Sequence, residues 1–412
     1  MLKKIAANTL LLSGSQILGR AIGFLYFIFL ARALGVTDFG VYAWVLGFVY
    51  NFYPLADFGL ERLVMRDIPR YPQKTNYYLA RLMPLRLFLA LGTLLVFLLT
   101  GFLMGLTLAK LFFVFLFGLS LIPSNLVFII AMIQNAREKA VAWAKITFAI
   151  PLIAAFLGIA IIQLKLPFWL LYTTFGWSTL VCLIWLIIKS PKLSLKIGWI
   201  IDLPFWRKLI KDSWLFAVIL TLAVFYLRMP LILIGRLLGD YWAGIYGAGS
   251  KFVEAGICIP QGFILALFPL SSRLVKSNKA RLKKIYFKAW RALFFASLPF
   301  ALIMIFGASW LIPLIYGVDY KPAVPVFSLM GVLMIFVFVN SLAGNVIHNS
   351  KKLKTFLPFA FMNFLVALIV GLFLIPRVGV IGGVWALIAG ESFGLIINNW
   401  FVFKILKGNN EE

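Results

Sequence analysis

The amino-acid sequence predicts an all-α polytopic membrane protein, with twelve transmembrane helices in two parallel six-helix lobes around a central cavity. Three observations lead to this fold class: an apolar composition, an alternation of charge between loops, and an internal repeat. Hydrophobic residues make up 63% of the 412 residues and charged residues 13%, whereas soluble domains contain about half and about a quarter. Lipid must therefore surround much of the chain.

Apolar runs long enough to cross a bilayer, about 20 residues each, give the twelve helices. In chain order they cover residues 10–31, 39–60, 82–106, 109–133, 141–163, 167–188, 210–234, 241–270, 289–315, 323–347, 355–375 and 379–403. The eighth and ninth runs are long, and Pro260, Pro269 and Pro299 predict tilts or kinks in them. The first run is too long for a signal-peptide core, so we expect a retained helix.

The loops between these runs alternate in charge. Basic residues gather in every second gap and at both termini, whereas the opposite gaps hold only Arg32, Lys110, Lys165, Arg236, Lys321 and Arg377. Cytoplasmic loops carry an excess of Lys and Arg, so we expect both termini in the cytoplasm and the chain in the cytoplasmic membrane. The same distribution accounts for the net charge of +26 without a nucleic-acid partner.

A repeat links the two halves of the chain. Residues 32–42, after the first run, match residues 236–246, after the seventh, without gaps at a constant offset of 204. The identical pairs are Arg32/Arg236, Leu34/Leu238, Gly35/Gly239, Gly40/Gly244 and Tyr42/Tyr246. Because six helices return the chain to its starting side, both copies insert with the same orientation, about an axis along the membrane normal.

The repeat sets the expected domain organisation. We expect an N-terminal lobe over residues 1–188, a basic cytoplasmic linker over 189–211 and a C-terminal lobe over 212–412, working together as a monomer. Two bundles that rock about a central site give alternating access. The duplication therefore favours a transporter over a receptor or a structural anchor.

The motifs around the first loop carry a family resemblance. Leu-Ala-Arg-Ala-Leu-Gly (30–35), Asp-Phe-Gly-Val-Tyr (38–42), Ala-Asp-Phe-Gly-Leu (56–60) and Arg-Asp-Ile (66–68) resemble the polysaccharide-biosynthesis oligosaccharide (O-antigen) flippases. These belong to the multidrug/oligosaccharidyl-lipid/polysaccharide exporter superfamily. The resemblance is clearest over the first 70 residues, and the length, the repeat and the loop charges extend it over the chain.

The resemblance implies a function. Such a protein would move a polyprenyl-(pyro)phosphate-linked oligosaccharide from the cytoplasmic to the external leaflet, driven by an ion gradient or the membrane potential. The sequence has no Gly-x-x-x-x-Gly-Lys-[Ser/Thr] loop for ATP. The expected partners are the lipid-linked oligosaccharide, the lipid bilayer and either H⁺ or Na⁺.

Charged residues inside the spans are the candidate site residues, because a charge at mid-bilayer depth costs about 2.5–3.5 kcal/mol unless it faces a cavity or a partner. Arg20, Arg228 and Lys251 are predicted to hold the phosphate or pyrophosphate of the headgroup, or acidic sugars. Asn340 is predicted to join them on the cavity wall, although it could also bond a neighbouring helix. Structural ion pairs remain the alternative, since Lys251 and Glu254 are spaced to neutralise each other.

Three acidic residues are candidates for H⁺ or Na⁺ coupling: Glu391, Glu254 and Asp57. Asp57 could instead anchor the inner end of its helix beside Arg62. Arg86 lies near the cytoplasmic end of its span, so we expect its side chain to snorkel.

The remaining polar and aromatic features predict no further site. Tyr226 and Tyr246 belong to an aromatic cluster that we interpret as interfacial belt. Cys182 and Cys258 lie in apolar runs with no metal-ligand or disulfide spacing. We expect no metal and no cofactor.

Two other functions remain open. A multidrug or cation antiporter of the same superfamily is the nearer one, but a site for cationic drugs favours acids. A membrane-embedded polysaccharide polymerase or glycosyltransferase is the second, but the external gaps are short and hold no Asp-x-Asp pair. We therefore expect a transporter and not an enzyme.

Overall fold

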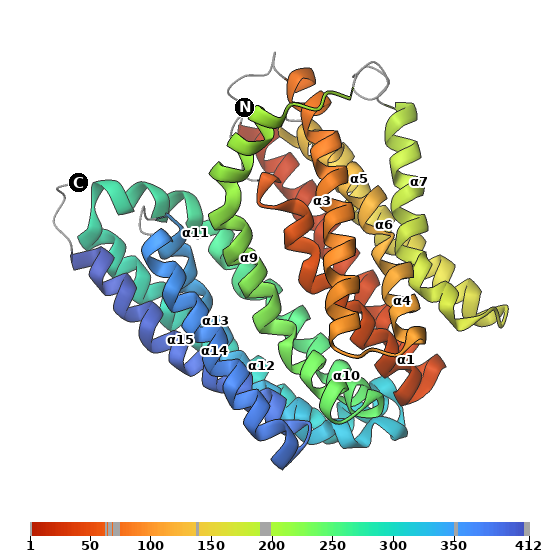
Figure 1. The fold of residues 1–412 in the computed structure, drawn as a ribbon. Helices are drawn as coiled ribbons and strands as arrows, with labels where there is room; N and C mark the ends of the chain where they lie inside the picture. The colour runs from red at the N-terminus through yellow and green to blue at the C-terminus, as the bar shows by residue number, and fades with distance from the viewer. Residues whose placement is uncertain are drawn as a thin grey trace. The chain divides into compact units, whose positions relative to one another are not determined.

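A computed structural model describes residues 2–61, 64, 68, 75–136, 140–189, 199–349 and 353–407. The regular structure in these ranges is helical (Figure 1). Ten helices within them are long and apolar enough to cross a membrane. The all-α, multi-pass fold class is confirmed, whereas the count of twelve helices and their arrangement in lobes stay predictions. The predicted anchor Arg62 lies outside the described residues.

The chain divides into two compact units, and α1 and α9 each run through both. The first unit comprises Met1–Phe29 and Val45–Val224, and the second comprises Leu30–Trp44 and Phe225–Glu412. The first unit contains most of α1 (Leu2–Asp57), then α3 (Thr75–Leu103), α4 (Leu108–Gly118), α5 (Leu121–Ala136), α6 (Ala140–Gln163), the 3-10 helix η2 (Phe168–Thr173), α7 (Thr174–Lys189) and the first part of α9 (Leu203–Leu237).

The second unit contains the rest of the helices. They are α10 (Asp240–Gly256), α11 (Cys258–Ser277), α12 (Lys279–Tyr316), the 3-10 helix η3 (Val318–Ala323), α13 (Val324–Asn349), α14 (Leu353–Val378) and α15 (Ile381–Lys407). In this unit α13 packs on α12 and on α15, and α15 also packs along α14 (Figure 1).

The first, second and eighth predicted spans differ in form from the helices observed. The first two predicted runs are joined in α1, which bends at the non-helical Gly35. The eighth run is split at Ile257 into α10 and α11, and neither piece is among the ten long apolar helices. Pro260 follows this break in the first turn of α11, where a missing N–H is tolerated. In contrast, α12 continues through Pro299.

The start of α9 is tied to α3 within the first unit. The Arg81 Nε atom lies 2.7 Å from the Asp202 Oδ2 atom, and the Trp206 indole N–H donates to the Arg81 carbonyl oxygen at 2.8 Å. The backbone N–H of Ile200 donates to the carbonyl oxygen of Ala80 at 3.0 Å. The described end of the predicted linker is therefore ordered, and it is helical from Leu203 onward.

Residues 30–44 are held in the second unit by the end of α12. The Arg32 Nε atom donates to the carbonyl oxygen of Ile315 at 2.7 Å, and its Nη2 atom donates to that of Leu314. A cation at a helix C-terminus satisfies carbonyl groups that have no partner within the helix. The Tyr320 hydroxyl donates to the Ala31 carbonyl oxygen at 2.9 Å. These bonds anchor the bend that follows the first span.

The repeated segments meet each other inside the second unit. Equivalent glycines have the same unusual backbone, with φ 74° and ψ 173° at Gly35 and φ 98° and ψ 176° at Gly239. A Cβ atom at Gly40 would lie 1.9 Å from the Asp240 carbonyl oxygen, and one at Gly244 would lie 2.1 Å from the Val36 carbonyl oxygen. Val36 and Asp240 are themselves equivalent, so the contact is reciprocal, as a local two-fold axis requires.

Candidate functional site

The helix α10 carries a candidate site because small residues bring it close to its neighbours. Added Cβ atoms would meet Ala43 at Gly247, Met330 at Gly249 and Met334 at Gly256. Glycines at such positions let helix backbones approach closely. The helix is thereby held among its neighbours.

Lys251, Glu254 and Arg228 form one charged cluster. The Lys251 Nζ atom lies 2.6 Å from Glu254 Oε2, and the Arg228 Nη2 atom lies 3.3 Å from Glu254 Oε1. One carboxylate therefore bridges two cations on two helices, α10 and α9. The three side chains leave one positive charge in excess, and each is between 22% and 27% exposed. The predicted i, i+3 pair is present, and the sequence did not predict that Arg228 joins it.

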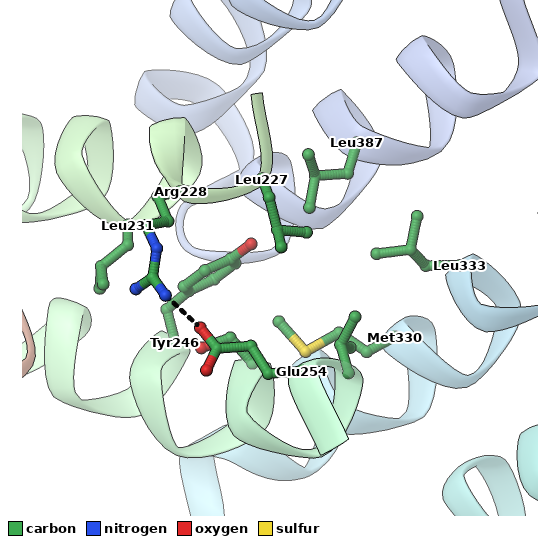
Figure 2. A pocket seen from close by; sticks show the side chains of 10 residues that line it. Leu227, Arg228, Leu231, Tyr246, Glu254, Met330, Leu333 and Leu387 are labelled. Atoms are coloured by element: carbon green, nitrogen blue, oxygen red, sulfur yellow. Dashed lines mark ion pairs between the residues drawn. The ribbon is translucent and has the colours of Figure 1, made fainter. Parts of the chain in front are cut away.

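A pocket of about 370 Å³, a volume that includes space open to solvent, lies against this cluster. Figure 2 shows Arg228 and Glu254 pointing toward each other at its edge. Tyr246 and Ser250 add hydroxyl groups, and the other lining residues are apolar: Leu227, Leu231, Val253, Met330, Leu333 and Leu387. The enclosed part has room for about one water, so a larger ligand would have to widen the pocket by moving side chains. We call it the cationic pocket.

Tyr246 corrects one sequence interpretation. It is 1% exposed, and its ring lines the cationic pocket (Figure 2). The Tyr226 hydroxyl is also directed inward, where it donates to the Leu387 carbonyl oxygen at 3.0 Å. The assignment of these two rings to an interfacial belt is therefore wrong. Close packing around Gly383, where an added Cβ would meet both Tyr246 and Pro230, holds α15 against α9 here.

A second polar cluster surrounds Glu391 on α15. The Asn340 amide on α13 donates to Glu391 Oε2 at 2.7 Å, and its carbonyl oxygen accepts from the Asn398 amide at 2.7 Å. The Tyr226 hydroxyl lies close to the Glu391 carboxylate, with its own hydrogen bond donated to the Leu387 carbonyl oxygen. In the described part of the chain no basic side chain forms an ion pair with Glu391. Asn340 therefore bonds Glu391 through its amide nitrogen and Asn398 through its amide oxygen.

Glycines on α15 make the space for this Glu391 cluster. A Cβ atom at Gly390 would lie 2.7 Å from the Tyr226 hydroxyl oxygen, and one at Gly394 would lie 2.9 Å from the Asn340 amide nitrogen. Asn363 on α14 also faces Gly394, and its Oδ1 atom is enclosed without a hydrogen-bond partner. An enclosed acceptor with no donor is costly. The cluster therefore has one open position for a proton donor, a water or a cation.

The first unit holds the other two predicted site residues, Arg20 and Asp57. Arg20 is exposed on α1. The preceding residue, Gly19, faces α6, where an added Cβ would lie 2.5 Å from the Thr147 carbonyl oxygen. Successive helical residues are turned by about 100°, so Arg20 points away from that contact.

Asp57 is paired with Arg86. Its Oδ1 atom accepts from Arg86 Nη2, and its Oδ2 atom accepts from the Gly59 N–H at 3.1 Å. Arg86 is 2% exposed and also donates to Asn125 Oδ1 at 3.3 Å. The expectation that Arg86 snorkels is wrong, because a partner inside the unit neutralises it. Asp57 therefore carries a structural ion pair, and its role in ion coupling stays a prediction.

Comparison with known proteins gives one family and one shared fold. A family model described as polysaccharide biosynthesis protein matches residues 5–275. No curated protein matches the chain. Among solved structures, the chain is similar to lipid II flippase MurJ in an inward closed conformation, at 16% identity and a TM-score of 0.68. That match covers 96% of this chain and 90% of that one.

Two further structures are similar over nearly their whole length. One is a MOP superfamily transporter from Pyrococcus furiosus whose reverse pocket polarity suggests a different function, at 14% identity and a TM-score of 0.65, covering 97% and 96% of the two chains. The other is the eukaryotic MATE transporter AtDTX14, at 11% identity and a TM-score of 0.65, covering 98% and 96%. At these identities the likeness shows a shared fold.

Proposed function

Because this chain belongs to the family of polysaccharide biosynthesis proteins, we propose that it is a flippase for a polyprenyl-(pyro)phosphate-linked oligosaccharide. It would carry the headgroup from the cytoplasmic to the external leaflet of the cytoplasmic membrane by alternating access. The predicted resemblance to this family is confirmed. Beyond membership in the family, we propose the substrate, the direction of transport and its driving force.

The cationic pocket is the observation that carries the proposal. Its cluster of Arg228, Lys251 and Glu254 has one positive charge in excess and lies next to a mostly apolar wall. Guanidinium groups bind phosphate oxygens with two donors at once. An apolar wall next to such a cation suits a lipid phosphate, whose tail is apolar. Arg20, exposed on α1 of the first unit, is proposed as a further headgroup ligand.

The Glu391 cluster supports coupling to an ion. A carboxylate with one amide donor and, among the described residues, no basic ion-pair partner can bind a proton, or a hard cation such as Na⁺ through its oxygens. The enclosed Oδ1 atom of Asn363 supplies a further oxygen. We propose that the coupling ion, H⁺ or Na⁺, binds at this cluster. The role that we propose for Asn340 is to position the Glu391 carboxylate through its hydrogen bond.

The nearest alternative is a multidrug or cation antiporter with the same fold, as in AtDTX14. The carboxylate of Glu254, whose side chain is 27% exposed, would be its drug ligand. Two cations already surround that carboxylate, so a cationic drug would meet net repulsion. This observation favours the anionic substrate. A polymerase or glycosyltransferase would need a catalytic acid cluster, and the described residues contain no group of three or more His, Cys, Asp or Glu side chains that could hold a metal.

The test is to delete the gene in its host and locate the lipid-linked oligosaccharide with a membrane-impermeant glycan probe, on intact cells and on inverted vesicles. We expect the glycan to accumulate on the cytoplasmic leaflet. Wild type should restore external display, and Arg228→Ala and Arg20→Ala should fail to restore it at equal expression.

The matched control is Arg377→Ala, which removes an exposed arginine at the end of α14, outside the cationic pocket. It should restore display like wild type. Unchanged glycan display in the deletion strain, together with sensitivity to cationic dyes, would establish the antiporter in place of the flippase.

A further inference from the structure

The carboxylate of Glu254 lies between the two cations that are proposed to bind a headgroup phosphate. Its two carboxylate oxygens each contact one cation, Oε1 with Arg228 and Oε2 with Lys251. An anionic ligand that uses the same two cations must therefore displace the carboxylate. Because Glu254 is attached one turn from Lys251 on α10, it competes at a high effective concentration.

We propose that Glu254 is a built-in competitor for the headgroup, and that binding of a pyrophosphate-linked lipid transfers one proton from water to Glu254. This inference rests on the proposed function and adds the residue that links headgroup binding to protonation. Before binding, the three side chains sum to one positive charge. With Glu254 protonated they sum to two, which match the two negative charges of a pyrophosphate diester.

The charge balance explains why the proton is taken up. A displaced, ionised Glu254 next to a doubly charged ligand would leave one uncompensated negative charge beside a mostly apolar wall. Such charges are costly, and like charges side by side disfavour ionisation. A proton from solution bonds to one carboxylate oxygen, Glu254 becomes neutral, and the cluster with its ligand sums to zero.

Among the described groups in and around the pocket, Glu254 is the one that can accept this proton. Arg228 faces it from α9, Lys251 and Tyr246 from α10, and Tyr316 from α12. The lining residues that α13 and α15 contribute are apolar: Met330, Leu333 and Leu387. The arginine and the lysine are already charged, and the tyrosines are neutral acids. Within the described pocket, Glu254 is therefore the base.

The test is calorimetric. The full chain is placed in phosphatidylcholine nanodiscs and titrated with farnesyl-pyrophosphoryl-N-acetylglucosamine, a diester whose own two charges do not titrate near neutral pH. Titrations at pH 7 in two buffers with different ionisation enthalpies count the protons. We expect about one proton taken up per ligand, and an affinity that rises about tenfold for each unit fall in pH between 8 and 6.

Two variants test whether Glu254 competes with the ligand. Glu254→Gln should bind the probe at least tenfold more tightly than wild type at pH 8, with no proton uptake and no pH dependence. The double variant Lys251→Gln/Glu254→Gln keeps the excess of one positive charge but lacks the competitor, so it too should take up no proton. Asp202→Asn, which changes a carboxylate in the first unit, should keep the uptake.

The outcomes separate this inference from the proposed function. Wild type that binds the probe without taking up a proton overturns the inference alone, and this measurement needs no variant to fold. Glu254→Gln that binds equally or more weakly at pH 8 also overturns it. Wild type that does not bind the probe contradicts the proposed substrate class, and the inference with it.

Discussion

The pair between Asp57 and Arg86 shows how a single side chain keeps a charge inside the first unit. Arg86 is almost fully enclosed, and its guanidinium bonds both Asp57 and Asn125. Removing one partner of a buried ion pair leaves a charge that neither water nor protein compensates, which costs about 3–5 kcal/mol. The carboxylate also accepts from the N–H of Gly59, so it closes the turn at the end of α1.

Asp57→Asn should therefore lower thermal stability strongly, with a loss of about 3–5 kcal/mol because Arg86 stays charged. Unfolding in detergent, followed by tryptophan fluorescence, measures the loss. Asp212→Asn removes an exposed carboxylate in the same unit and is the control. If Asp57→Asn is as stable as wild type but loses its response to an ion gradient, then Asp57 is a coupling residue as the sequence suggested.

Asp202 gives a prediction about pH. The Arg81 side chain, followed by the backbone N–H of Phe205, donates hydrogen bonds to its carboxylate and holds the pKa of Asp202 below its ordinary value. A lowered folded-state pKa stabilises the fold above the unfolded pKa of about 3.9, and this stabilisation is lost as the pH falls through the folded value.

Asp202→Asn should therefore lower the melting temperature at pH 7 and lower it less at pH 3. Melting temperatures across this range, combined with Arg81→Gln in a double-mutant cycle, measure the coupling between the two residues. Coupling that is equal at both pH values would show that Arg81 and Asp202 do not act as an ion pair.

At the scale of elements, the crossing of α1 and α10 depends on glycine. Any side chain at Gly40 or Gly244 would overlap a backbone carbonyl of the partner helix. Backbone cannot move aside as the end of a flexible side chain can, so overpacking here should exceed the usual cost of about 1–3 kcal/mol.

Gly40→Ala and Gly244→Ala should each abolish a monodisperse, folded protein, as judged by gel filtration of a fluorescent fusion. Gly92→Ala is the matched control, since an added Cβ on α3 would meet nothing within 4 Å. That variant should be as stable as wild type or more stable by about 0.5–1 kcal/mol. Normal folding of Gly40→Ala would contradict the crossing.

The elements also show which features the sequence could predict. The repeat identified the glycines that form the bend and the crossing, and the i, i+3 spacing predicted the pair of Lys251 and Glu254. The sequence could not predict partners on other helices. Arg86 was misplaced because α3 is apolar around its whole circumference, so no periodicity shows which face meets Asp57. Asn340 and Glu391 meet across 51 residues, and no local pattern encodes that contact.

At the scale of the whole molecule, the membrane topology depends on the split eighth run. The split eighth run, α10 and α11, decides whether the start of α12 is cytoplasmic. If the pieces together form one crossing, Ala280 at the start of α12 is inside, whereas Leu166 between α6 and η2 is outside.

Single cysteines test this, in a chain with Cys182→Ala and Cys258→Ala. A membrane-impermeant maleimide should label Leu166→Cys in intact cells, and should label Ala280→Cys only after permeabilisation; both side chains are exposed. The chain without cysteine gives the background. Labelling of Ala280→Cys in intact cells would show that α10 and α11 do not cross, and the twelve-helix topology would be wrong.

Ion coupling is also a property of the whole molecule. Glu391→Gln keeps the hydrogen-bonding shape of the Glu391 cluster but removes its charge, so transport should lose its dependence on the ion gradient while headgroup binding persists. Flux in proteoliposomes with an imposed H⁺ or Na⁺ gradient measures this and identifies the ion. Gradient-driven flux that survives in Glu391→Gln would remove this residue from the coupling mechanism.

The reciprocal contact of Gly40 and Gly244 bears on how such a chain could arise. A gene encoding one six-helix unit would need a single glycine codon for this contact, because in a parallel homodimer each copy would supply the same residue to the axis. Fusion of two such genes would preserve the crossing without any new surface. After fusion the two codons could change separately, yet neither glycine can be replaced without displacing the other helix. The codons for Gly40 and Gly244 would therefore both stay constrained, as the single codon was before the fusion.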